Sequence, residues 1–427
     1  MNNRSVHPPI RTLEALSLDH PNLRKLDNQV EVAFFNLGSQ DVIHVELVFK
    51  SGLSKSVNNV IPTAVSELLG SSSLKYSSGE IAEKIDYYGA FLESSINMDM
   101  CSVSIYCLTP HLKKVLEILK EALNNIVFEY KDLEVFLSNS AEKLKAELER
   151  VEYVCLKEFN KLLFANHPYG NSIGLSDFKS ITPEVLTSFK NDCYGSNNLN
   201  IIVSGRFDEQ QVYESLNDNF GTWKKEVSPF NCSKLTNSAA ENRHVLKAEA
   251  VQSAIRIGKI IPVNYGDNDY FNLKILTIIL GGYFGSRLMG NLREEKGLTY
   301  GVNSSLINYD GATFMVISTT VKGDATRIAL NEIYKEIASL TCDLIPENEL
   351  KTVKNYISGS MMKTIDGPFL VAEQYKLLNH KGKKLSHLQD FYAAVNKCSS
   401  EELLQIAKKY FSASSFSELV VGPSSNN

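Results

Sequence analysis

Two hydrogen-bond donors stand seven positions apart in the stretch NLREEKGLTYG, residues 291–301. Arg293 lies near the end of a predicted short helix that Gly297 terminates, and Tyr300 begins the next predicted strand. A guanidinium and a phenol are both donors, and donors already in place stabilise the charge that develops on a substrate carbonyl oxygen. Composition alone favours a plainer interpretation, in which Arg293 is solvated and Tyr300 is half-buried on its strand.

Two other stretches resemble ligand sites and are better explained as turns. The glycine-rich GGYFGSRL, residues 281–288, has neither the Lys-Ser/Thr ending of a P-loop nor GxGxxG spacing, so we predict a loop capped by Ser286. His167 heads the sequence HPYG, where Pro168 fixes φ and Gly170 is free to take a positive φ. We therefore predict that His167 is a turn residue and not a metal ligand.

The remaining metal-binding residue types are scattered. Glu147 and Glu149 in KLKAELERVEY are interpreted as solvated helix carboxylates. The seven cysteines contain no CxxC pair and are predicted to be buried thiols in a reducing compartment. The eight histidines are dispersed along the chain: His7, His20, His44, His111, His167, His244, His380 and His387. None of these sets predicts a zinc site.

The elements that must position these residues form a large repeat. The first half is predicted to contain a strand, two helices, two strands and a helix, at residues 42–52, 59–70, 78–89, 90–97, 101–108 and 111–127. The same series returns at residues 253–263, 270–282, 286–297, 298–306, 311–321 and 324–340. The closing segments 181–205 and 398–422 also match in kind. A separation of about 210 to 218 residues indicates duplication of a whole domain.

The repeat predicts an α+β fold of two homologous domains, each a mixed or antiparallel sheet covered by helices. Periodicity fades and small polar residues gather between the two halves. We therefore place an N-terminal domain at residues 1–228, a linker at 229–242 and a C-terminal domain at 243–427.

Three segments carry a resemblance to a known family: residues 75–108, 167–207 and 280–306. They resemble the pitrilysin/insulinase-type zinc metallopeptidases, which include the mitochondrial processing peptidase and its bacterial relatives. The resemblance runs from about residue 30 to about residue 422, with the elements in the family's order. It implies the duplicated two-domain fold of that family.

In that family a helix carries the motif HxxEH, whose two histidines bind zinc while the glutamate takes a proton from the metal-bound water. The resemblance places this motif on residues 63–67, where Thr63, Ser66 and Glu67 stand at the three functional positions. Glu147 or Glu149 stands near the family's third ligand. The resemblance therefore implies a degenerate zinc motif and no metal or other cofactor in this chain.

The resemblance also gives Arg293 and Tyr300 a role, because active members use such a pair in the C-terminal domain to hold the substrate carbonyl. A chain with this pair and no zinc ligands is expected to be inactive alone. It would be the substrate-binding subunit of a heterodimeric metalloendopeptidase whose homologous partner carries HxxEH and zinc, acting on unstructured peptides. Pairing with a second copy of itself is the alternative for the isolated chain.

Two other functions stay open. The chain is a catalytically inert structural or binding subunit if no such partner exists, as in the processing-peptidase-related core proteins. A self-sufficient hydrolase is the weakest alternative, because no GxSxG nucleophile motif is present.

Composition narrows the class of partner. The 427 residues carry a formal net charge of -5 with Lys and Arg scattered, which argues against nucleic-acid or anionic-membrane binding. No apolar run reaches the length of a signal peptide core or a membrane span. The sequence as given predicts a soluble, cytoplasmic protein.

Overall fold

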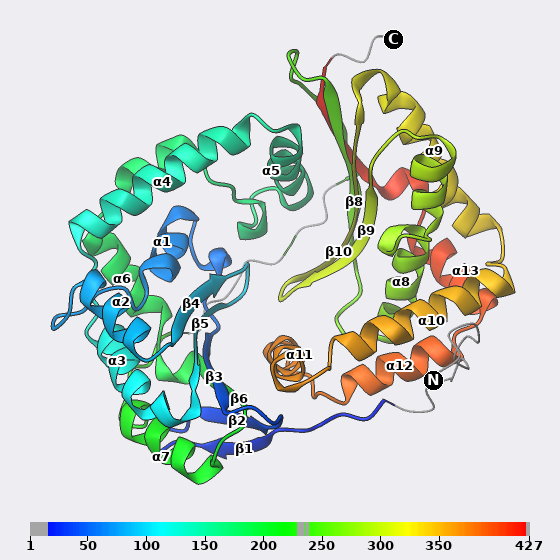
Figure 1. Ribbon diagram of the computed structural model, residues 1–427. Helices are drawn as coiled ribbons and strands as arrows, with labels where there is room; N and C mark the ends of the chain where they lie inside the picture. The colour runs from blue at the N-terminus through cyan, green and yellow to red at the C-terminus, as the bar shows by residue number, and fades with distance from the viewer. Residues whose placement is uncertain (1–15, 229–234, 236–238, 424–427) are drawn as a thin grey trace, which may run out of the picture.

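The computed structural model describes residues 16–228, 235 and 239–423. Figure 1 shows two halves that face each other, each a sheet with helices on its outer side. Most of the predicted linker, residues 229–242, lies outside the described residues, and strand β7 begins at Asn242. Among the described helices, none combines the length and apolar character that crossing a bilayer requires.

The first half is built on a six-stranded sheet of order β1-β2-β6-β3-β5-β4. Neighbouring strands are antiparallel except for β2 and β6, which are parallel. The strands are β1 (Asn22–Lys25), β2 (Glu31–Asn36), β3 (Val42–Phe49), β4 (Phe91–Ile96), β5 (Cys101–Leu108) and β6 (Leu199–Gly205). Its helices are α1 (Val60–Leu68), α2 (Ser78–Tyr87), α3 (Leu112–Asn124), α4 (Tyr130–Leu148), α6 (Pro183–Cys193) and α7 (Glu209–Phe220).

The second half repeats this plan on a five-stranded sheet of order β7-β11-β8-β10-β9, in which only the β7 and β11 pair is parallel. The strands are β7 (Asn242–Leu246), β8 (Gln252–Ile261), β9 (Val302–Tyr309), β10 (Ala312–Lys322) and β11 (Ser417–Gly422). The helices on its outer side are α8 (Asn268–Thr277), α9 (Thr326–Cys342), α10 (Glu347–Lys363), α12 (His387–Lys397) and α13 (Ser400–Tyr410). The predicted α+β class with mixed sheets is confirmed.

Each sheet buries one face under its own helices because its strands alternate in character. In β3, VIHVELVF, the residues Ile43, Val45, Leu47 and Phe49 are at most 1% exposed and join the core beneath the helices of the first half. Period-two alternation sends the intervening residues to the opposite face. That opposite face looks toward the other half of the protein (Figure 1).

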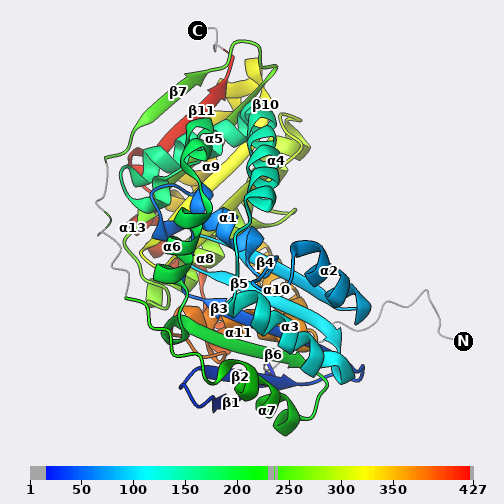
Figure 2. The ribbon, with the colours of Figure 1, turned by 90° about the vertical axis from the view of Figure 1, so that its left-hand side faces the viewer.

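The two halves exchange one helix each across this inner side. Helix α5 (Val151–Phe164) belongs to the first half of the sequence, yet it packs on β8 and β11 of the second sheet. Helix α11 (Pro368–His380), from the second half, packs on β2 and β6 of the first sheet. Both helices lie between the sheets in Figure 1, and Figure 2 shows the same sheets from the side.

Close packing under α5 depends on a glycine in the sheet. A Cβ at Gly258 of β8 would lie 3.0 Å from Cζ of Phe159 and 2.3 Å from the backbone oxygen of Met315. Only a residue without a side chain allows α5 to approach the sheet this closely. The exchange of helices therefore rests on specific side-chain sizes, and it makes the two halves mutually dependent.

A buried ion pair holds α11 to the first sheet. Lys376 Nζ lies 2.9 Å from Oε1 of Glu46 on β3 and 2.6 Å from Oε2 of Glu373, and the side chains of Lys376 and Glu46 are 12% and 7% exposed. His44, on the same face of β3, stacks on Tyr106 with ring centroids 4.0 Å apart. Burial, reinforced by Lys376 and opposed by Glu373, lowers the pKa of His44 to about 4.

We expect His44 to make stability depend on pH. Its folded pKa, about 4, lies below the ordinary value of 6.5, so the unfolded chain binds more protons between these values and stability falls as pH falls through this window. Between pH 7 and pH 5 the loss is expected to be about 2 kcal/mol. Urea unfolding of the protein and of His44→Phe at both pH values checks this. Equal losses in the two proteins would refute the assignment to His44.

Candidate functional site

Arg293 and Tyr300 line the same open cavity in the second half. Both side chains are exposed, Tyr300 to 92%, and the cavity of about 370 Å³ also includes the glycine-rich turn. The Arg293 guanidinium carbon lies 4.9 Å above the ring of Phe284. The structure therefore brings the two donors that the sequence singled out to one cavity, where both residues are exposed.

The backbone around this cavity is wound more loosely than the sequence predicts. Two π-helical turns, Ile278–Gly282 and Met289–Glu295, flank the glycine-rich loop. Such turns are rare in proteins as a whole, but those that occur are often found at functional sites. A Cβ at Gly281 would meet the backbone nitrogen of Ser304 at 2.8 Å, so this turn packs directly on β9.

Polar contacts fix the turn that carries Arg293. Arg287 donates from Nε and Nη2 to the two carboxylate oxygens of Glu349, at 2.8 and 2.9 Å. Asn291 donates from Nδ2 to Glu332 and Glu336, at 2.9 and 2.7 Å. Both acceptor sets lie on helices of the outer layer. Arg293 is thus an exposed side chain on a backbone that polar contacts hold in place.

The local structure differs from the sequence predictions in two details. Tyr300 precedes β9, which begins at Val302, so it is fully exposed and not half-buried on a strand. The predicted cap at Ser286 is wrong, because its buried Oγ has no hydrogen-bond partner among the described residues. Gly297 does end the helical segment, with φ of +62° and its N–H donating to the carbonyl of Arg293.

The residues that the resemblance places at the zinc-motif positions lie on α1, in the other half. Thr63 Oγ1 donates to the carbonyl of Asn59 at 2.7 Å, and Ser66, 3% exposed, accepts from the Cys101 thiol at 3.5 Å. Glu67 is exposed. The three residues do not line the cavity of Arg293 and Tyr300.

The other candidate ligands have local partners. Glu147 pairs with Arg150 at 3.2 Å, and Glu149 pairs with Lys247 at 3.3 Å. His167 is a buried cap whose Nδ1 accepts from the backbone N–H of Tyr169 at 3.2 Å, as its turn sequence predicts. His7 lies outside the described residues.

Zinc does not fit the residues that α1 presents. The family's site needs two imidazoles, and here a threonine hydroxyl and a buried serine stand with one exposed carboxylate. Hydroxyl oxygens are poor replacements for imidazole or thiolate ligands. No catalytic step through zinc follows from this chain.

We accordingly expect the purified chain to hold well under one zinc ion per molecule after dialysis, because Glu67 offers one carboxylate at most. Elemental analysis of the dialysed protein measures this. About one zinc per chain, lost in a Glu67→Ala variant, would contradict it.

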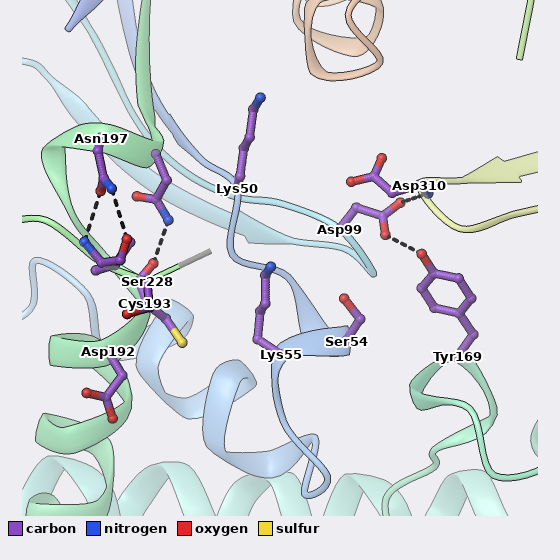
Figure 3. Close-up of a pocket in the computed structure, with 12 residues that line it drawn as sticks. Lys50, Ser54, Lys55, Asp99, Tyr169, Asp192, Cys193, Asn197, Ser228 and Asp310 are labelled. Atoms are coloured by element: carbon purple, nitrogen blue, oxygen red, sulfur yellow. Dashed lines mark hydrogen bonds between the residues drawn. The ribbon is translucent and has the colours of Figure 1, made fainter. Parts of the chain in front are cut away.

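A polar cluster that the sequence does not predict joins the two halves (Figure 3). Tyr169 donates from its hydroxyl to Asp99 Oδ1 at 3.0 Å, and the backbone N–H of Asp310 donates to Asp99 Oδ2, also at 3.0 Å. Lys381 Nζ lies 2.9 Å from Asp310 Oδ1 and 3.6 Å from Asp99 Oδ2. These residues meet only after the two halves have packed, so the sequence does not indicate the cluster. It indicates only that each aspartate lies in a turn between two paired strands.

Basic groups within this cluster oppose the repulsion between its two carboxylates. Burial and the nearby Asp310 raise the pKa of Asp99, against the pull of Lys381. Burial would also raise the pKa of Asp310, but His380 and Lys381 outweigh it and lower that pKa to about 2. Asp99, Asp310 and His380 form the only trio of potential metal ligands within the described residues, and the Lys381 ammonium already supplies their cation.

Sequence comparison places this architecture in a family. Residues 65–175 match the family model described as insulinase, peptidase family M16. Residues 180–357 match the model described as the peptidase M16 inactive domain. The two matches together span most of the chain and include strands of both sheets. The chain belongs to peptidase family M16.

Relatives of this M16 chain carry contrasting descriptions. It is 21% identical over 415 residues to an uncharacterized zinc protease of Rickettsia felis, covering 94% of this chain and 97% of the relative. It is 24% identical over 331 residues to a non-peptidase homolog of Helicobacter pylori, covering 72% and 74%. The crystal structure of a peptidase M16 inactive domain from Pseudomonas fluorescens matches with a TM-score of 0.87 at 19% identity, covering 95% and 98%. The structural likeness shows a shared fold.

Proposed function

We propose that this chain is the zinc-less, substrate-binding subunit of a heterodimeric metalloendopeptidase that degrades unstructured peptides. A homologous M16 chain with an intact HxxEH motif supplies the zinc. This chain then contributes Arg293 and Tyr300 to the shared active site and is inactive alone.

The observation that carries the proposal is the contrast between the two halves. Arg293 and Tyr300 are exposed and share one cavity, and Arg287 and Asn291 brace the turn that carries Arg293. Helix α1 offers Thr63 at the position of a zinc-binding imidazole and Ser66 at the position of the general base. A retained donor pair stabilises a developing oxyanion only when another chain provides the nucleophile.

The sheet edge beside this pair suits an extended peptide. Strand β9 begins two residues after Tyr300, and within the described residues it pairs with β10 alone. A peptide that adds as a strand gains main-chain hydrogen bonds with little demand on its sequence. An unstructured peptide substrate fits this arrangement better than a folded one.

The second candidate is a catalytically inert structural or binding subunit. The residues on α1 favour it equally, and the non-peptidase homolog of Helicobacter pylori is a relative whose description fits it. This role requires neither an HxxEH partner nor exposed donors at residues 293 and 300.

Co-expression with an HxxEH-bearing homologue from the same genome separates the two functions. We expect the chains to co-purify and only the mixture to cleave unstructured peptides. Association without cleavage favours the inert subunit. Cleavage by this chain alone, insensitive to chelation of zinc, would refute both.

A further inference from the structure

An arginine lies on the inner face of the second sheet, close to the proposed site. Arg256 is in the middle of β8, between Ile255 and Ile257, which point to the opposite face and are at most 1% exposed. Alternation directs Arg256 toward α5 and the space between the halves. Its cross-strand neighbours are Ser318 on β10 and Leu419 on β11.

The Arg256 guanidinium has no counter-ion among the residues that the structure describes. It forms no ion pair or hydrogen bond with another residue in the described part of the chain, although it is half-buried. Burial lowers its pKa, with only Cys155 and Tyr309 opposing. A half-buried charge without a partner is unfavourable, so a ligand that neutralises it gains binding energy.

Arg256 lines a cavity of about 430 Å³. Its lining combines Arg256 with residues that carry hydroxyl groups, from the segment before β9 and from β10: Thr299, Tyr300, Ser318, Thr319 and Thr320. Tyr300, Gly301 and Ser318 also line the cavity of Arg293. The two cavities are therefore adjacent, and an extended molecule bound at Arg293 and Tyr300 reaches Arg256.

We propose that Arg256 binds a carboxylate of the substrate peptide and so selects peptides that carry a negative charge beside the cleavage region. This inference rests on the proposed peptide-binding function. The planar guanidinium presents paired N–H donors that match the two oxygens of a carboxylate. A C-terminal carboxylate and a Glu or Asp side chain share this chemistry.

One acidic residue lines the same cavity, and replacing it gives a control variant whose expected effect on peptide binding is opposite. Glu152 on α5 is exposed, and its Oε1 accepts from Thr320 Oγ1 at 3.5 Å. No ion pair joins it to Arg256 among the described side chains. Its charge repels an incoming carboxylate, so Glu152→Gln is expected to strengthen binding of an acidic peptide while Arg256→Met weakens it.

The test uses fluorescein-labelled unstructured peptides of one sequence with the isolated full chain. One form has an amidated C-terminus and no acidic residue, a second has only a free C-terminal carboxylate, and a third has only one Glu side chain. Fluorescence anisotropy at fixed ionic strength gives each Kd. We expect one of the carboxylate forms to bind roughly tenfold more tightly than the neutral form.

In Arg256→Met this preference should disappear while the neutral peptide binds as before, and Arg256→Lys should keep part of it. If Arg256→Met does not fold, the opposite effect of Glu152→Gln carries the test. A preference that survives Arg256→Met, or equal binding of all three forms, overturns the role of Arg256 and leaves the proposed function standing. Failure of every peptide to bind overturns the proposed function as well.

Discussion

Replacing Arg293 by alanine or Tyr300 by phenylalanine is expected to lower the turnover number of the reconstituted heterodimer by about 10² to 10³. Each change removes a donor that stabilises the oxyanion as negative charge develops on the substrate carbonyl. Steady-state kinetics on an unstructured peptide measures the effect. A loss in kcat places the interaction in the transition state, whereas a rise in KM alone means uniform substrate binding.

Folding and association should hardly change in these variants, because both side chains are exposed. Surface replacements usually change the free energy of unfolding by no more than about 0.5 kcal/mol. Arg243→Ala and Tyr87→Phe are matched controls, because both residues are exposed and lie outside the cavity. Full activity in the variants of Arg293 and Tyr300 would mean that these residues are ordinary surface residues without a role in the reaction. The inert-subunit function would then be preferred.

Local periodicity explains why so much of the fold can be predicted. The alternation in residues 42–49, and the helical pattern in residues 112–124, fix both the element and its buried face before any long-range contact forms. Duplication adds a second copy of the series, so each half supports the interpretation of the other. Gly297 is predictable for the same reason, since the end of a helix is a local event.

The exchange of helices and the surroundings of Arg256, which the sequence does not predict, depend on contacts between distant segments. Nothing in the sequence of α5 indicates that it covers the second sheet. An apolar helix face predicts that the face is buried, but not which surface it packs against. Arg256 is hidden within an apolar strand, and only the position of α5 shows that it faces a cavity. The one signal was a charged residue that interrupts the run SAIRIG.

The helix exchange predicts that Lys376→Met will be strongly destabilising. Lys376 is the only described cation within 4.0 Å of Glu46, and both side chains are nearly buried. Removing one partner leaves an uncompensated buried charge, which costs about 3 to 5 kcal/mol. The midpoint of urea unfolding measures the loss. Because Lys376 also helps to depress the pKa of His44, the variant should lose part of the pH dependence assigned to that residue.

Two further variants decide whether the cost comes from the buried charge or from the lost lysine. Lys145→Met breaks an exposed ion pair, in which the side chain of Lys145 is 55% exposed and that of Glu142 is 68% exposed. This variant should change the free energy of unfolding by less than about 0.5 kcal/mol. The double variant Glu46→Met/Lys376→Met removes both charges and should recover most of the stability, since apolar replacements of a buried pair are often neutral or better. A double variant as unstable as Lys376→Met would instead mean that α11 is held to the first sheet by the shape of the lysine side chain and not by its charge.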